Sequence, residues 1–171
     1  MDLPITINKK GCIFFYTEKP NVRDKYHRHV FSQFYNCNFK DDIGNTYYCA
    51  EQYMMAMKAK MFDESMFSTI MSEKNAGKIK RLGRQIKNFN QEEWDKAKFN
   101  IVVSGNYYKF SQNPELRQII IATGNKLLVE AAKHDSIWGI GFNSYEAPTD
   151  TRLWGQNLLG KALMEVRSQL S

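Results

Sequence analysis

The pattern of hydrophobic and polar positions changes near residue 50 of the chain. Before this point, aromatic and β-branched residues form short runs, CIFFY from residue 12, HVFSQFYNCNF from residue 29 and DDIGNTYYCAEQ from residue 41. The last run contains a glycine turn between Asp42 and Asn45. Such runs, bounded by turn residues, predict short strands and a hairpin. From Ala50 onward, the good helix formers of AEQYMMAMKAKMF predict a helix.

Later segments carry the signals of helix starts and ends. The segment QEEWDKAKFNIVVSGNYYKF follows Asn90, a capping residue, and has acids in its first turn. Pro114 suits the first turn of the next helix, which Thr123 and Gly124 end. NLLGKALMEVRSQL predicts the last helix. Without a repeat, a linker or a Ser- or Gly-rich tract, residues 1–171 are predicted to form one predominantly helical α+β domain with short strands and hairpins.

Composition and charge narrow the class of protein. Of the 171 residues, 43% are hydrophobic and 25% are charged, which excludes a disordered chain. No apolar run approaches the roughly 20 residues of a membrane span, and the N-terminus lacks a signal-type segment, so we expect a soluble cytoplasmic protein without membrane partners. The net charge of +6 favours anionic partners. The lysines scattered over residues 74–87, however, are typical of a solvated helix face.

The cysteines and histidines do not favour a metal site. Cys12, Cys37 and Cys49 are odd in number and lack the paired spacing of zinc ligands, which indicates free buried thiols. His27 and His29 lie two residues apart, and the third histidine is remote from them. We therefore expect no structural metal and no cofactor.

Two charged residues fall on the apolar side of the helix that begins near Ala50. On a helical wheel at about 100° per residue, Glu51 and Lys58 share an arc with the large apolar residues, about two turns apart. That arc contains Tyr53, Met54, Met55, Met57, Met61 and Phe62, and the opposite side carries Gln52, Ala56, Ala59 and Lys60. Buried charges are costly unless they are paired or face a polar cavity. Glu51 and Lys58 are therefore either paired in the core or part of a pocket.

The last helix has a glycine and an arginine at the edge of its apolar stripe. Gly160 in a helix interior costs about 1 kcal/mol relative to Ala, which indicates that another backbone or a ligand comes close. Arg167, about two turns later, is suited to hold a phosphate or a carboxylate with two hydrogen bonds. Asn157 precedes the helix and either caps it or binds substrate.

The segment VEAAKHDSIWGIGF, residues 129–142, sets two acids against a tryptophan and glycines. It predicts either a capped helix followed by a turn or the wall of a pocket. Trp138 beside Gly139, like Trp154 in LWGQNLLG, offers a flat ring next to a bare backbone, which suits a slot for a base or a ribose. A core position remains the ordinary place for a tryptophan.

Longer motifs connect these features to a known family. The ordered segments are FSQFY (31–35), YYCAEQYMMAMKAKMF (47–62), GRQIKNFNQEEWDKAKFNIVVSGNYYKFSQNPELR (83–117), TGNKLLVEAAKHDSIWGIGF (123–142) and WGQNLLGKALMEVR (154–167). On these motifs the chain resembles the NADAR superfamily and is similar to the riboflavin biosynthesis intermediate N-glycosidases. The sequence departs from the family at Gln33, where Ser-Asn-Phe is usual, and residues 1–30 match no known motif.

The resemblance implies a compact, mostly helical α+β fold and a hydrolase that cleaves the N-glycosidic bond between a ribose and a base. Family substrates are ribosylamino-pyrimidine phosphates of riboflavin biosynthesis or ADP-ribose attached to guanine in nucleic acid. The expected partner is thus a small ribosylated base or an ADP-ribosylated nucleic acid, with the oligomeric state open. A competing interpretation is a non-catalytic module that binds ADP-ribose or a nucleotide. It explains the basic charge, the Trp-Gly slots and Arg167 equally well, but the buried acids and Lys58 less well.

Cleavage of a ribose C–N bond builds positive charge at the anomeric carbon and needs a protonated leaving nitrogen, so acids are expected in the site. The catalytic candidates are Glu51, Lys58, Glu130 and Asp135. A desolvated Lys58 amine is a nucleophile for a Schiff base with the opened sugar; alternatively, a charged Lys58 binds phosphate or a hydroxyl. The predicted substrate-binding residues are Phe31, Ser32, Phe34, Tyr47, Trp94, Lys109, Trp138, Gly139, Asn157, Gly160 and Arg167.

Overall fold

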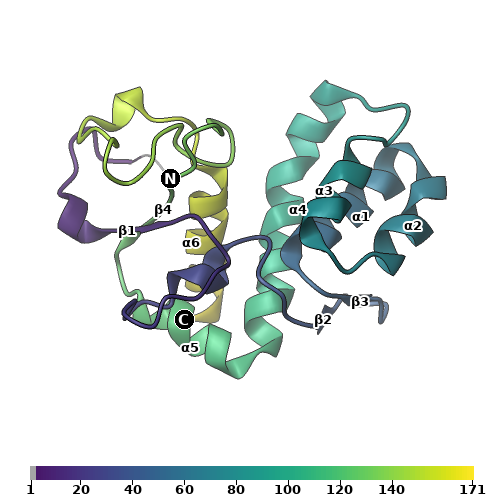
Figure 1. Cartoon of the computed structure of the whole chain (residues 1–171), viewed down its shortest axis with the longest axis horizontal. Helices are drawn as coiled ribbons and strands as arrows, with labels where there is room; N and C mark the ends of the chain where they lie inside the picture. Colours follow the sequence, from purple (N-terminus) through teal and green to yellow (C-terminus); the bar gives the residue numbers. More distant parts are fainter. Residues whose placement is uncertain (1–2) are drawn as a thin grey trace. The chain divides into compact units, whose positions relative to one another are not determined.

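The structure is a computed structural model that describes residues 3–171, and it divides into two compact units. The terminal unit consists of the chain up to Ser32 together with Pro114–Ser171, and the central unit consists of residues Gln33–Asn113. The chain therefore passes from one unit to the other twice, after Ser32 and after Asn113 (Figure 1).

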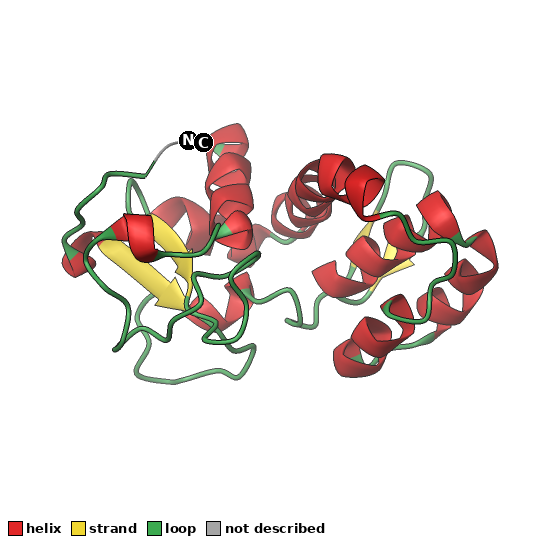
Figure 2. Ribbon diagram, turned by 90° about the horizontal axis from the view of Figure 1, so that it is seen from above, coloured by secondary structure: helices red, strands yellow, loops and turns green. Residues whose placement is uncertain are grey.

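The terminal unit is built on two parallel strands. β1 (Cys12–Phe15) pairs with β4 (Leu127–Glu130), so that Cys12 lies opposite Leu127 and Phe15 lies opposite Glu130 (Figure 2). The helices of this unit are α5 (Pro114–Ala122) and α6 (Leu158–Leu170), with short 3-10 turns η1 (Lys9–Gly11), η2 (Arg28–Phe31) and η4 (Thr151–Leu153). The strand predicted for CIFFY is confirmed, but its partner is more than a hundred residues away instead of in a neighbouring hairpin.

The central unit begins with the predicted hairpin. β2 (Phe39–Lys40) and β3 (Thr46–Tyr47) pair antiparallel across a turn in which Gly44 has a φ of 89°. The Asp41 carboxylate accepts hydrogen bonds from the backbone N–H groups of Ile43 and Asn45 at 3.1 and 2.9 Å, which fixes the turn. The preceding run HVFSQFYNCNF has no described strand before Phe39. Its first residues, 29–31, lie in the η2 turn, where Val30 and Phe31 are buried.

Four helices complete the central unit. They are α1 (Ala50–Phe62), α2 (Phe67–Ser72) with the short turn η3 (Glu64–Met66) before it, α3 (Ala76–Gly83) and α4 (Gln91–Gln112). α4 starts where predicted, since the Asn90 side chain accepts a hydrogen bond from the Glu93 N–H at 3.0 Å. α1 packs against the other three helices (Figure 1). Gly105 allows α4 to approach α1, because a side chain there would meet the Tyr53 ring.

The predicted polar side of α1 is wrong except at Lys60, which is exposed. Gln52, Ala56 and Ala59 are each 0% exposed, whereas Met61 from the predicted apolar arc is 39% exposed. The Gln52 amide donates to the carbonyl oxygens of Ile70 at 3.1 Å and Glu73 at 2.8 Å, and its oxygen accepts from the Tyr48 N–H at 2.7 Å. Because α1 packs against α2, α3 and α4, residues 50–56 are all buried, and the glutamine is stabilised by backbone partners instead of water.

The predicted helices of the terminal unit are confirmed. α5 starts at Pro114 and is followed by Gly124, whose φ is 56°. Asn157 precedes α6, but its side chain does not cap the helix. Its Oδ1 accepts from the Glu130 N–H and its Nδ2 donates to the Leu128 carbonyl, both at 3.0 Å, so the amide binds the strand β4.

These elements form a predominantly helical α+β fold, as predicted, with six α-helices and short strands over residues 3–171. None of the helices in this described part combines the length and the apolar character that crossing a bilayer requires.

The contact between α6 and β4 depends on Gly160. A methyl group at this position would overlap the Leu128 carbonyl oxygen and the Asn157 amide. Gly160→Ala is therefore expected to lower the free energy of unfolding by about 2 kcal/mol or more, measured by urea denaturation. Gly11→Ala is the matched control, because no atom lies within 4 Å of an added methyl group there. Equal stabilities of the two variants would contradict this account.

Candidate active site

Glu51 and Lys58 lie on the same buried helix of the central unit. Glu51 is in the first turn of α1 and 7% exposed, and its backbone N–H donates to the Gln33 carbonyl oxygen at 3.0 Å. Lys58 is half-buried and follows about two turns later. The helix thus holds a carboxylate and an amine in surroundings with little water.

The amine of Lys58 lies among aromatic rings. Its Nζ is 4.5 Å from the centre of the Phe89 ring and 5.8 Å from that of Trp94, and it donates to the Gly83 carbonyl oxygen at 3.1 Å. Burial lowers the pKa of Lys58, the negative charge of Glu51 opposes this effect, and the positive charge of Arg84 adds to it. The lowered pKa agrees with a nucleophilic amine, whereas the aromatic and carbonyl contacts favour the charged form in the free protein.

Lys109 is a second buried amine in the central unit. It lies on α4, is 0% exposed, and its Nζ is 5.4 Å from the ring centre of Tyr35 and 5.1 Å from that of Phe110. Burial lowers its pKa to about 8, although the thiols of Cys37 and Cys49 act in the opposite direction. Burial in turn raises the pKa of Cys49 to about 11.

The other candidates near the start of the central unit are mostly core residues. Tyr47 is 0% exposed, its ring stacks on Phe39 with centres 5.6 Å apart, and its hydroxyl donates to the Asp41 carboxylate at 2.9 Å. Burial raises the pKa of Tyr47. Phe34 is half-buried, and the Lys80 Nζ lies 5.9 Å from its ring centre.

Phe31 and Ser32 are buried at the end of the first segment of the terminal unit. Phe31 is 0% exposed and packs edge-to-face on Phe15, with ring centres 5.6 Å apart. Ser32 is 7% exposed, and its N–H donates to the His29 carbonyl oxygen at 3.3 Å. Both residues are therefore packed against other residues of the terminal unit.

The segment 129–142 forms the end of β4 and a tight series of turns, so the helical interpretation of this segment is wrong. Glu130 is half-buried at the last position of β4. The Asp135 carboxylate accepts from the N–H groups of Ile137 and Trp138, both at 2.9 Å, which stabilises the turn. One oxygen of Asp135 is thus occupied by the backbone.

The Trp138–Gly139 pair lies at the start of α6. The Trp138 carbonyl accepts from the Leu159 N–H and the Gly139 carbonyl accepts from the Asn157 N–H, both at 3.1 Å. A methyl group on Gly139 would come within 2.9 Å of the Glu130 and Asp135 carbonyl oxygens, so the turn requires glycine here. Trp138 is half-buried, whereas Trp154 is 9% exposed and belongs to the core beside Phe14.

Arg167 has partners within the terminal unit. Its Nη1 donates to the Thr123 hydroxyl at 2.8 Å and to the Lys126 carbonyl oxygen at 2.9 Å, and burial lowers its pKa. These bonds fix the turn between α5 and β4. Anion binding by Arg167 stays a prediction, in which the remaining guanidinium nitrogens would take part.

The structure therefore gathers the candidates in two groups, one in each unit. The central group contains Glu51, Lys58, Trp94, Phe34, Tyr47 and Lys109, and the terminal group contains Phe31, Ser32, Glu130, Asp135, Trp138, Gly139, Asn157, Gly160 and Arg167. Sequence reasoning missed Phe89 and Asn106. A wheel of α4 carried the signal for Asn106, because the buried positions of that helix include Lys98, Asn106 and Lys109 beside apolar residues.

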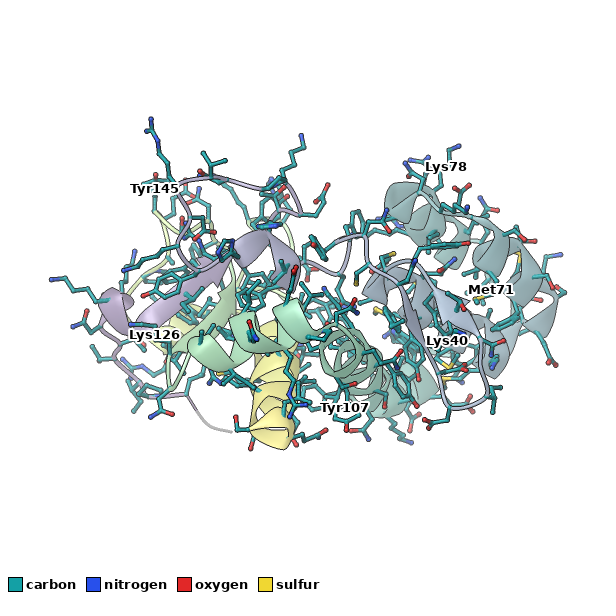
Figure 3. All side chains as sticks on the ribbon, turned by 90° about the horizontal axis from the view of Figure 1, so that it is seen from below. Lys40, Met71, Lys78, Tyr107, Lys126 and Tyr145 are labelled. Carbon is teal, nitrogen blue, oxygen red and sulfur yellow. The ribbon has the colours of Figure 1, made fainter. Side chains whose placement is uncertain are left out.

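The basic segment 74–87 lies outside these groups. α3 carries exposed Lys78, Lys80 and Arg81, and Figure 3 shows Lys78 pointing outward, as predicted for a solvated helix face. Lys78 and Arg81 line a shallow groove of about 350 Å³ together with Thr69, Ser72, Glu73, Leu82 and Gln85. None of the predicted catalytic residues lines this groove. Within residues 3–171, no three His, Cys, Asp or Glu side chains gather as a metal site.

Residues 14–171 match the NADAR domain, and the chain belongs to this family. N-glycosidase R617 of Acanthamoeba polyphaga mimivirus is 47% identical over 148 residues, which cover 82% of this chain and 87% of that protein. N-glycosidase YbiA of Escherichia coli strain K12 is 31% identical over 141 residues, which cover 82% and 81% of the two chains. The NMR structure of E. coli YbiA has a TM-score of 0.73 at 29% identity and covers 97% of this chain and 88% of that chain. Both the predicted family and the predicted fold class are confirmed.

The buried amine of Lys109 generates a pH-dependent stability. The folded protein releases this proton near pH 8 and the unfolded chain near pH 10.5, so the unfolded state binds more protons between these values and stability rises with pH. Relative to Lys109→Met, the wild type is expected to gain about 3 kcal/mol across this window, measured by urea denaturation from pH 7 to 10.5. Cys49 is present in both proteins, so the contribution of its titration to the free energy of unfolding largely cancels in the difference between them. A difference that stays constant with pH would contradict the buried-amine assignment.

Proposed function

We propose that the protein hydrolyses the bond between ribose C1 and the nitrogen of an anionic ribosylated base, with Glu51 and Lys58 as its catalytic pair. The protein is a hydrolase of N-glycosyl bonds, and its relatives from mimivirus and E. coli are named N-glycosidases. The observation that carries the proposal is the position of the Lys58 amine over the rings of Phe89 and Trp94. The negative charge of Glu51 on the same helix acts on the pKa of this amine.

The reaction requires a negative charge near the anomeric carbon. As the C1–N bond lengthens, positive charge develops on C1, and a carboxylate such as that of Glu51 stabilises it. The same group is suited to carry a proton to the leaving nitrogen or to orient the attacking water. Glu51 is favoured over Asp135 because one Asp135 oxygen already accepts two backbone hydrogen bonds.

Lys58 supplies a nucleophile in the covalent form of the proposal. Opening of the ribose ring of a ribosylamine gives an iminium at C1, to which the neutral Lys58 amine adds. The base amine leaves with a proton, and C1 remains joined to Lys58 as a Schiff base. Water then hydrolyses this Schiff base, so that the sum of the steps is substrate and water giving free base and sugar.

Two substrate classes fit this proposal, ADP-ribosylated guanine in nucleic acid and the ribosylamino-pyrimidine phosphates of riboflavin biosynthesis. Both are anionic, in agreement with the net charge of +6. Glu130 remains a second carboxylate candidate, because it is half-buried at the end of β4. Non-catalytic binding of ADP-ribose is the competing function.

Incubation with an ADP-ribosylated guanine oligonucleotide and with the pyrimidine ribosylamine phosphates, followed by mass detection of the released base, tests the proposal. We expect base release from at least one substrate class by the wild type. Glu51→Gln is expected to lower turnover roughly 10²–10⁴-fold, because it removes the charge and the proton carrier. Circular dichroism and thermal melting should show an unchanged fold.

Binding without base release would favour the competing function as a binding module. Normal turnover by Glu51→Gln, or a variant that merely unfolds, would refute the assignment of Glu51. The ranking of the two substrate classes by kcat/KM gives the specificity of the enzyme.

Borohydride reduction tests the covalent role of Lys58. During turnover, reduction of the Schiff base is expected to attach the sugar permanently to Lys58, which peptide mass spectrometry detects, and to inactivate the enzyme. The exposed Lys60 on the same helix is the internal control and should stay unmodified. Normal turnover without substrate-dependent labelling of Lys58 would exclude the Schiff base and leave Lys58 as a charged binding group.

A further inference from the structure

Two amide side chains of the central unit, Gln33 and Asn106, have buried atoms without hydrogen bonds. Asn106 lies on α4 and is 0% exposed, whereas Gln33 is half-buried. The Gln33 Nε2 donor and the Asn106 Oδ1 acceptor are closed to solvent and lack a hydrogen-bond partner within the described residues 3–171. Such atoms are rare in folded proteins, because each one loses its bonds to water without replacement.

The hydrogen bonds of the two amides determine which of their atoms remain without a partner. The Asn106 Nδ2 donates to the Val102 carbonyl oxygen at 2.9 Å and to the Gln33 Oε1 at 2.8 Å. Turning the Asn106 amide over would place its oxygen against these two acceptors. Turning the Gln33 amide over would place two NH₂ groups against each other. Both alternatives are therefore unfavourable, and the unpaired atoms are the donor of Gln33 and the acceptor of Asn106.

The amide pair is attached to the helix that carries the proposed catalytic residues. The Gln33 carbonyl oxygen accepts from the Glu51 N–H at 3.0 Å, which ties the residue to the first turn of α1. Gly105, beside Asn106, lies against the Tyr53 ring, so α4 and α1 are in close contact at this level. The residues that carry the unpaired donor and acceptor are thus tied to the first two turns of α1, the helix that carries Glu51.

We infer that Gln33 and Asn106 bind one hydroxyl group of the substrate's ribose, an inference that rests on the proposed function. A hydroxyl oxygen accepts a hydrogen bond from Gln33 Nε2 while its proton is donated to Asn106 Oδ1. A phosphate or carboxylate would set a second acceptor against Oδ1, and an ammonium group would set a donor against Nε2. The pair therefore selects a neutral group that both donates and accepts.

A contact of this kind suits the cleavage of a glycosidic bond. Hydrogen bonds to a hydroxyl next to the anomeric carbon strengthen in the transition state and hold the sugar in position. A site that keeps buried polar groups for a hydroxyl also discriminates against sugars that lack it, because those groups then stay unpaired. Gln33 and Asn106 act as positioning and specificity residues, whereas Glu51 and Lys58 carry the chemistry.

The test combines Gln33→Met with substrates that lack either the 2- or the 3-hydroxyl of the ribose that is released. In the wild type, one of these deoxy analogues is expected to lose roughly 10- to 100-fold in kcat/KM. Gln33→Met should lose a similar factor with the complete substrate. With the variant, however, the penalty for the missing hydroxyl should fall to within about threefold, because the donor is already absent.

Gln91→Met is the matched control, since Gln91 is exposed on the same helix as Asn106. It should keep the full penalty of the wild type. A full penalty in Gln33→Met would overturn the inference. A penalty for altered bases that disappears in Gln33→Met would also overturn it and assign the pair to the base. Equal kcat/KM for complete and deoxy substrates in the wild type would show that the amides hold an ordered water only.

The outcome is separable from that of the proposed function. If the wild type cleaves neither substrate class, the proposed function fails, and the hydroxyl contact is tested by calorimetry with ADP-ribose and its deoxy analogues. A loss of affinity on removal of one hydroxyl that is seen in the wild type and in Gln91→Met, but not in Gln33→Met, supports the contact without catalysis. Equal affinities for ADP-ribose and its deoxy analogues in the wild type would overturn it.

Discussion

The enclosure of α1 by α2, α3 and α4 is the constraint on which the central unit depends. In the first two turns of α1, which are almost entirely buried, each polar side chain needs a partner within the protein. Gln52 meets this requirement through backbone carbonyls of the neighbouring helix, so its role is structural. Glu51 and Lys58 meet it differently, since loss of water strengthens their electrostatic interaction and alters the reactivity of the amine. The same burial thus stabilises the core through Gln52 and lowers the pKa of the Lys58 amine.

Much of the fold could be predicted because its signals are local. Asn90 and Pro114 mark helix starts through their own backbone chemistry, and the β2–β3 turn is set by its glycine and its Asp41 carboxylate. The parallel pairing of β1 with β4 could not be predicted, since it joins segments that share no local signal. The wheel of α1 failed for a related reason. It assumes one solvent face along the whole helix, and only tertiary packing shows that the first two turns are buried all round while the last turn is partly exposed.

Glu51 and Lys58 were predicted as site residues because they are charged side chains on an apolar helix face. Such a criterion identifies a functional site only where the hydrogen-bond and ionic partners of the charged groups are known. Arg167 was predicted from its place at the edge of an apolar stripe and Asn157 from its place before the last helix, yet both bind backbone or hydroxyl groups of their own unit. Gln33 was noticed only as a departure from the family pattern. Its side chain, paired with Asn106, nevertheless takes part in the network beside Glu51. The role of such a residue depends on hydrogen bonds to segments that are distant in the sequence. A single sequence does not show these bonds.

The division of the chain also bears on the order of folding during synthesis. The central unit is one continuous segment, Gln33–Asn113, so all of its internal contacts become available once that segment has left the ribosome. In the terminal unit, β1 has no strand partner until β4 has been synthesised, more than a hundred residues later. The nascent chain consequently exposes the edge of β1 and its apolar residues until β4 has been made, so this strand is a segment at risk of aggregation during synthesis.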